Sequence, residues 1–174
     1  NGINMDAQGR IVIANFGGPE ELACGPLQRL DPSNGKVELL CDAIGGRKLF
    51  GANYPIVDSK ERIWCTHSTW GPMDAAFNGQ DDGLVFRYDP DGSVTVVAEN
   101  IRFANGVALD YDELNLFVCE TTGCDVLRYS ILPDGSLGAP EVYGPKLGYS
   151  SIEVQDQRPL PLAMRSQMGL TDGC

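Results

Sequence analysis

Side chains that carry oxygen atoms recur at a fixed spacing along this chain. Asn1, Asn53 and Asn105 lie 52 residues apart, and Asp172 takes the matching place in a fourth copy. Amide and carboxylate oxygens are the ligands that hard divalent cations prefer, so this set predicts a metal site if the fold gathers it. A tight turn is the alternative reading of Asn-Gly, and it is the one we expect for Asn1.

Two more polar residues share a second matching position in the copies. His67, the only histidine, follows the second apolar run of its copy, as Glu120 does in the next copy. Both are candidates for contact with a bound substrate. The alternatives are a loop-capping role for His67 and the bonding of turn amides by Glu120. A single histidine and the absence of a G-x-S-x-G sequence disfavour a serine-hydrolase triad.

A repeat of about 52 residues predicts the elements that position these side chains. Five residues after each leading Asn comes an Asp, and an apolar run follows it; these residues are Asp6, Asp58 and Asp110. Later in each copy an alternating run, centred on Arg29, Arg87 or Arg128, leads into a turn rich in Pro, Asp, Asn and Gly. Such alternation is typical of antiparallel hairpins. About four short strands per copy is the pattern of a β-propeller blade.

We therefore predict an all-β fold, with one partial β-propeller domain. Because the first strand of each blade lines the central channel, the leading Asn residues and Asp172 should converge at one mouth of that channel. Three blades cannot close a ring, so either residues are missing at both ends, which we expect, or two copies associate. The expected segments are blades at about 1–50, 51–101 and 102–148, a loop or insertion at 149–169, and the start of another blade at 170–174, all within 1–174.

Composition restricts the class of protein. The chain has 174 residues, 43% of them hydrophobic, with a formal net charge of −11. This charge argues against partners such as nucleic acid or an anionic membrane. No apolar run is long enough to cross a membrane, and the first residues lack a signal-peptide pattern. The six cysteines lack zinc-ligand spacing, and we expect Cys65 and Cys119 to be buried thiols. These features favour a cytoplasmic protein.

The segment from about residue 84 to 138 resembles the regucalcin (senescence marker protein)/gluconolactonase family. It carries the hairpin "RYDPDGS", followed by "NGVALD" and "LFVCET". At the level of blades the resemblance extends over nearly the whole chain. It implies a six-bladed β-propeller, of which about half is present here, with one divalent cation in the central channel. Ca²⁺ is the first expectation, and Mg²⁺, Mn²⁺ and Zn²⁺ are alternatives.

The resemblance also implies roles for single residues. The metal-binding Asn of the family falls on Asn105, and its metal-binding Asp, also implicated as the catalytic base, falls on Asp172. A channel Asn that contacts substrate or metal-bound water falls on Asn53. Gly51 stands where the family often has an Arg, which puts recognition of a sugar lactone in doubt. The first metal ligand of the family, a Glu, would precede residue 1.

The implied activity is metal-dependent hydrolysis of a small lactone or ester. The cation would polarise the carbonyl, and Asp172 would take a proton from the attacking water. Asn53, His67 and Glu120 form the expected substrate-binding set. The alternative is a non-catalytic propeller that binds a small molecule or a protein partner, because a fold alone does not confer activity. We expect self-association only if the half-propeller is the native chain.

Overall fold

A computed structural model describes residues 1–16, 25–71, 78–150 and 152–153. Three four-stranded antiparallel sheets follow one another along the chain. Their strands are β1 (Ile3–Met5), β2 (Ile11–Ala14), β3 (Leu27–Asp31) and β4 (Lys36–Cys41) in blade 1; β7 (Ala52–Val57), β8 (Ile63–His67), β9 (Gly83–Tyr88) and β10 (Val94–Ile101) in blade 2; and β11 (Ala104–Leu109), β12 (Asn115–Glu120), β13 (Asp125–Ser130) and β14 (Glu141–Val142) in blade 3. The two-residue strands β5 (Ala43–Ile44) and β6 (Arg47–Lys48) pair in a hairpin between the first two blades.

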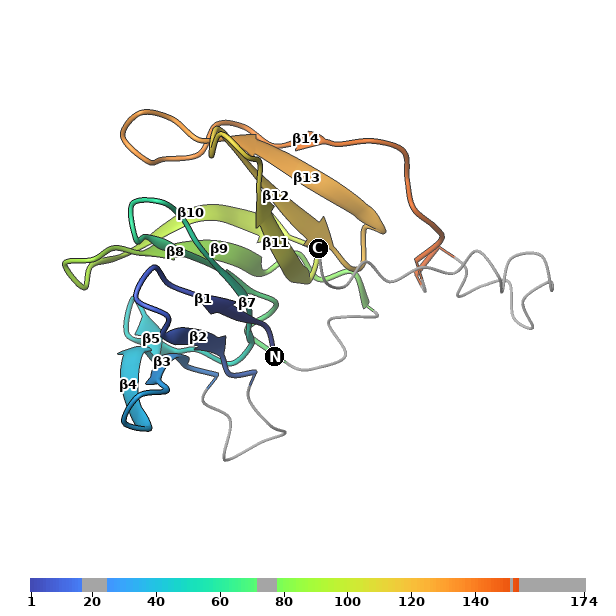
Figure 1. Cartoon of the computed structure of the whole chain (residues 1–174). Coiled ribbons are helices and arrows are strands. Elements are labelled where there is room, and N and C mark those ends of the chain that lie inside the picture. Colours follow the sequence, from blue (N-terminus) through green and yellow to red (C-terminus); the bar gives the residue numbers. More distant parts are fainter. Residues whose placement is uncertain (17–24, 72–77, 151, 154–174) are drawn as a thin grey trace.

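The three sheets lie side by side in chain order, from blue through green to orange in Figure 1. Their first strands are neighbours, because β7 contacts both β1 and β11. This arrangement confirms the all-β propeller prediction. In the described ranges, no helix has the length and apolar character that crossing a membrane requires. The expected start of another blade at 170–174 and most of the insertion at 149–169 lie outside the described residues.

Blades 1 and 2 share an apolar core that draws on alternate strand residues. On β8, Ile63 and Cys65 belong to this core, together with Val12 and Leu27 of blade 1. Cys65 is completely buried, and this burial raises the pKa of its thiol well above the ordinary value. Successive side chains of a strand point to opposite faces, so the residue between Ile63 and Cys65 must serve another core.

That residue is Trp64, which belongs to the core between blades 2 and 3. Its indole is fully buried with Val85 of blade 2 and with Leu116 and Val118 of blade 3. Strands covered on both faces read as continuous apolar runs rather than as alternating ones. The apolar run that begins at Ile63 therefore marks a central blade of the arc.

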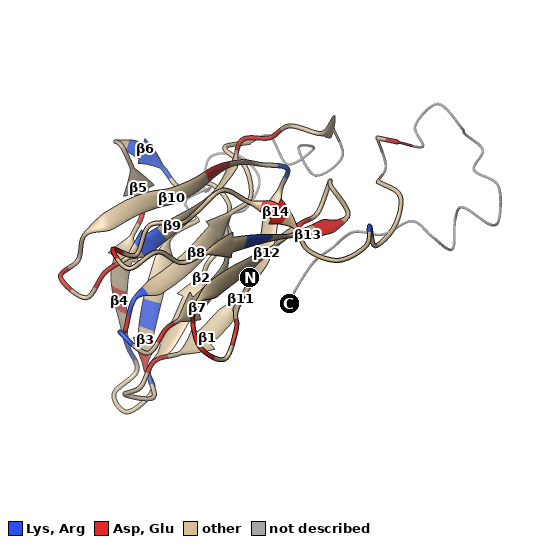
Figure 2. Ribbon diagram, turned by 90° about the horizontal axis from the view of Figure 1, so that it is seen from above, with Lys and Arg blue, Asp and Glu red and all other residues tan. Residues whose placement is uncertain are grey.

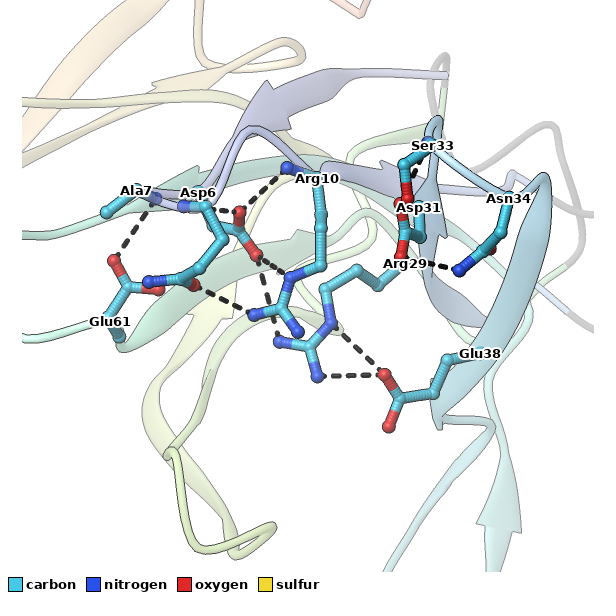
Figure 3. Close-up of polar contacts among 10 residues, drawn as sticks. Asp6, Ala7, Arg10, Arg29, Asp31, Ser33, Asn34, Glu38 and Glu61 are labelled. Atoms are coloured by element: carbon cyan, nitrogen blue, oxygen red, sulfur yellow. Dashed lines mark hydrogen bonds and ion pairs between the residues drawn. The ribbon is translucent and has the colours of Figure 1, made fainter.

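An aspartate organises the turn after the first strand of each blade. In blade 1, Asp6 accepts hydrogen bonds from the backbone N–H of Arg10 at 2.8 Å and from its Nε at 2.7 Å. Arg29 Nη1 lies 3.9 Å from the same carboxylate and Arg29 Nη2 donates to Glu38 at 2.8 Å, so the four side chains form one ion network (Figure 3). Asp58 repeats the pattern in blade 2. The repeated Asp therefore builds turns.

Carboxylates in these turns also join neighbouring blades. Glu61 of blade 2 accepts from the backbone N–H of Ala7 in blade 1 at 3.2 Å (Figure 3). Glu113 of blade 3 accepts from the backbone N–H of Ser59 in blade 2 at 2.7 Å. Both glutamates adopt positive φ angles, 61° and 54°, which side-chain-bearing residues rarely do. These hydrogen bonds between turns connect neighbouring blades at the C-terminal ends of the first strands, and the leading asparagines lie at the opposite ends.

Charged side chains and cysteines lie in different environments in the described part of the chain. Acidic residues occupy many of the turns, and charged residues of both signs also lie on strands such as β3, β4 and β9 (Figure 2). Cys65 and Cys119 are buried, as expected, and so are Cys41 and Cys124.

Candidate functional site

The second residues of β7 and β11 are the predicted site residues Asn53 and Asn105. Their side chains are only 2% and 7% exposed, and their strands are adjacent. Asn1 lies beside them, because its Nδ2 donates to Asn53 Oδ1 at 3.0 Å. The fold thus gathers the three leading asparagines at one end of the first strands. Asp172 lies outside the described residues, so its expected place in the set stays a prediction.

A hydroxyl group holds each of the two buried asparagines. Asn53 Nδ2 donates to Ser68 Oγ at 2.7 Å, and Asn105 Nδ2 donates to Thr121 Oγ1 at 3.0 Å. Ser68 and Thr121 are equivalent residues, each the first after the second strand of its blade. Sequence reasoning did not single them out, although a hydroxyl residue recurs there after His67 and after Glu120. The two amides therefore sit in equivalent settings.

The side-chain oxygen of Asn105 is buried and has no hydrogen-bond partner within the described part of the chain. Leaving a buried acceptor unpaired costs about 1–3 kcal/mol, so native proteins rarely do it without a reason. A neutral amide oxygen in this state fits a hard cation or a ligand N–H or O–H group. Among the described residues no three His, Cys, Asp or Glu side chains gather into a metal site. A cation bound at Asn105 would therefore take its ligands from amide oxygens and from residues outside the described ranges.

His67 ends strand β8 with a fully buried imidazole. Its Nε2 accepts a hydrogen bond from the backbone N–H of Phe50 at 3.2 Å, and its ring centroid lies 4.2 Å from that of Trp70. Burial lowers the pKa of His67 to about 4, so the ring is neutral near pH 7. The imidazole thus accepts from a loop amide, and its contact with a substrate stays a prediction.

Glu120 ends strand β12 and pairs with Arg102. The carboxylate accepts from the backbone N–H of Arg102 at 2.7 Å and from its Nη2 at 2.8 Å. Burial and the nearby charge of Glu120 raise the pKa of Asp125. Glu120 therefore bonds a backbone amide, one of the two roles considered for it, and its contact with a substrate stays a prediction.

A cleft of about 300 Å³ opens beside this ion pair. Its volume is at the lower limit for a small-molecule site. Thr122, one of its lining residues, directly follows Thr121, the hydroxyl partner of Asn105, in the sequence. The residues that line it are Asn78, Gly79, Arg102, Thr122, Lys146, Ser150, Ile152 and Glu153.

Comparison with known proteins extends this description. The sequence profile of the SMP-30/Gluconolactonase/LRE-like region matches residues 1–145. An adipocyte plasma membrane-associated protein of Salmo salar is 31% identical over 140 residues, which are 75% of this chain and 32% of that protein. Lactonase drp35 of Staphylococcus saprophyticus is 28% identical over 151 residues, 84% of this chain and 42% of that protein.

Solved structures show the same architecture. A gluconolactonase of Xanthomonas campestris superposes with a TM-score of 0.68 and 26% identity over 86% of this chain and 50% of that one. The calcium-binding protein regucalcin of Agrobacterium tumefaciens gives a TM-score of 0.59 at 16% identity, over 81% of this chain and 43% of that one, and shows the fold alone. The chain spans about a third to a half of the length of these relatives. Because the profile match covers most of its residues, the chain belongs to the SMP-30/gluconolactonase/LRE-like family.

Proposed function

We propose that this chain forms part of the central-channel site of a divalent-metal-dependent hydrolase that opens lactones or esters. The observation that carries the proposal is that Asn105 Oδ1 is buried and has no hydrogen-bond partner among the described residues. Relatives named lactonase and gluconolactonase support hydrolysis of a lactone as the reaction class. The relative named as a calcium-binding regucalcin makes Ca²⁺ the first cation to test.

The proposed ligands of the cation from this chain are Asn105 Oδ1 and the carboxylate of Asp172. The chemistry that such a cation supplies is polarisation of the ester carbonyl and compensation of the negative charge that develops on its oxygen. Asn53 is proposed to orient the substrate or the attacking water. Its Oδ1 accepts from Asn1, and the second lone pair of that oxygen can accept from a substrate hydroxyl or from water.

Asp172 is proposed as the general base. Its carboxylate would take a proton from water as the water oxygen attacks the carbonyl carbon. The carbon–oxygen bond of the ester then breaks, and the proton passes to the departing oxygen, so that a lactone and one water yield one hydroxy acid. His67 is neutral near pH 7, but its Nε2 is already occupied by Phe50, so we assign it no proton transfer.

The test is hydrolysis of a panel of lactones and esters, δ-gluconolactone among them, with EDTA and with added Ca²⁺, Mg²⁺, Mn²⁺ or Zn²⁺. We expect cation-dependent hydrolysis that Asn105→Ala lowers by about 100-fold or more, because it removes a metal ligand. Asn34→Ala, an exposed turn residue of blade 1, is the matched control and should keep full activity. Undiminished cation-dependent hydrolysis by Asn105→Ala would refute the site, and cation binding without any hydrolysis would favour a non-catalytic binding propeller.

A further inference from the structure

Two hydroxyl groups of blade 2 donate hydrogen bonds to the backbone carbonyl groups on either side of the Asn105 Cα. Thr66 Oγ1 donates to the carbonyl of Asn105, and Ser68 Oγ donates to the carbonyl of Ala104 at 2.7 Å. Both hydroxyl side chains are fully buried, and both acceptors belong to the first strand of blade 3. The two hydrogen bonds therefore cross from blade 2 to blade 3 at Asn105, the residue whose side-chain oxygen lacks a partner in the described ranges.

The single proton of each hydroxyl is committed to a backbone carbonyl of blade 3. Thr66 Oγ1 also accepts from the backbone N–H of Tyr54 at 3.0 Å, and its single proton goes to Asn105. The single proton of Ser68 goes to Ala104, so Ser68 Oγ can only accept from Asn53. The Asn53 group that contacts Ser68 must therefore be the NH₂ group and not the oxygen. This assigns the nitrogen and oxygen positions of the Asn53 side-chain amide, which are otherwise hard to tell apart.

Blade 1 uses a different connection at the equivalent place. The residues that match Thr66 and Ser68 there are Ala14 and Phe16, and neither has a hydroxyl group. The carbonyl of Asn53 instead accepts from the backbone N–H of Gly2 at 2.7 Å. A first strand can thus be joined to its neighbour without side-chain hydroxyls. The hydroxyl pair occurs at the junction that carries Asn105.

We propose that Thr66 and Ser68 are positioning residues of the channel site. They hold the peptides on both sides of Asn105, and Ser68 ties the orientation of the Asn53 amide to the same strand. The side-chain oxygen of Asn105 is thereby kept at a fixed place relative to Asn53. The inference rests on the proposed function, in which this oxygen binds a divalent cation.

The first test needs no cation. We expect the ¹⁵N order parameter of the Asn105 side-chain amide to be high in the parent chain and to fall below about 0.6, the range of flexible groups, in Thr66→Val and Ser68→Ala. Thr66→Ser keeps the hydroxyl and should retain the parent value. Thr69→Val is the matched control, because Thr69 is a fully buried hydroxyl residue that bonds Asp82 rather than either asparagine. An order parameter that stays high in both hydroxyl-deletion variants, or that falls equally in Thr69→Val, overturns the inference.

The second test measures the melting temperature against Ca²⁺ and Mn²⁺ concentration. Loss of groups that orient a ligand typically weakens metal affinity 10- to 100-fold, and we expect about this rise in the apparent Kd for Thr66→Val and Ser68→Ala. Thr69→Val should lower the melting temperature without changing the apparent Kd. If the parent chain gains no stability from any cation while the order parameters fall as expected, the proposed metal function fails and the positioning role stands. An unchanged apparent Kd in both variants refutes the positioning role at the metal site.

Discussion

Asn53 and Asn105 occupy the same position in adjacent blades, yet their side-chain oxygens differ. Asn53 Oδ1 accepts from Asn1 Nδ2 at 3.0 Å, whereas Asn105 Oδ1 is buried without a partner in the residues described. Both amides donate to a hydroxyl group at equivalent places. The repeat therefore places two asparagines in equivalent positions, and of the two only Asn105 has a side-chain oxygen with no hydrogen-bond partner among the described residues.

Asn105→Asp tests what that oxygen is for. An unpaired buried carboxylate is costly, so we expect the variant to lose about 1–3 kcal/mol of unfolding free energy in EDTA. A cation held by the new carboxylate should recover most of this loss, so the melting temperature should depend more steeply on Ca²⁺ than in the parent chain. Thermal unfolding with and without Ca²⁺ measures both effects. Asn34→Asp, in an exposed turn, is the control, and an equal loss under both conditions in Asn105→Asp would contradict a cation site.

Leu116→Ala tests the core between blades 2 and 3. Leu116 is fully buried in that core, and such truncations cost about 2–5 kcal/mol because they remove apolar contacts and leave a cavity. Met5→Ala, on β1, should cost less than about 0.5 kcal/mol, because Met5 is 62% exposed in the described structure. Denaturant titration of the 174-residue chain measures both values. A large loss in Met5→Ala would show that another surface covers the free face of blade 1.

Glu113→Ala tests the joint between the turns of blades 2 and 3. The variant loses two hydrogen bonds from Ser59, one from its backbone N–H and one from its Oγ, and we expect a loss of about 0.5–1.5 kcal/mol in unfolding free energy for each. Glu113→Gly removes the same two bonds but suits the positive φ of 54°, so it should be less destabilising than the Ala variant. Asp112→Ala, an exposed neighbour in the same turn, is the control. Equal stability of the Ala variant and the parent chain would exclude a contribution from this joint.

The sequence predicts the fold well because the repeat is encoded in local chemistry. Alternation and turn residues specify each hairpin, and the 52-residue period brings Asn53 and Asn105 to neighbouring strands. Contacts between blades are harder to foresee. The donation from Ser68 to the Ala104 carbonyl joins residues 36 apart, and no periodicity in the sequence marks it. The burial of the His67 imidazole is another such case. It depends on contacts with the Phe50 N–H and the Trp70 ring, which the place of His67 in the repeat does not indicate.

His67 also makes stability depend on pH in a defined direction. Desolvation is the main cause that lowers the folded-state pKa of His67 from 6.5 to about 4, assisted by the charge of Arg47 and opposed by that of Asp82. Between pH 6.5 and about 4 the unfolded chain therefore binds a proton that the folded chain does not. Unfolding free energy should rise with pH across this window and fall as the solution is acidified, by about 3 kcal/mol in total from this group.

His67→Gln isolates this effect, because glutamine cannot titrate yet can still offer an oxygen to the N–H of Phe50. Relative to its own value at pH 7, the variant should lose about 3 kcal/mol less than the parent chain when both are acidified to pH 4. Denaturant unfolding at half-unit steps of pH gives a curve of unfolding free energy against pH for each protein. The contribution of the carboxyl groups is common to both curves, so it cancels in their difference. Parallel curves from pH 7 to 4 would mean that His67 titrates normally, and that its imidazole is accessible to solvent and available to a substrate after all.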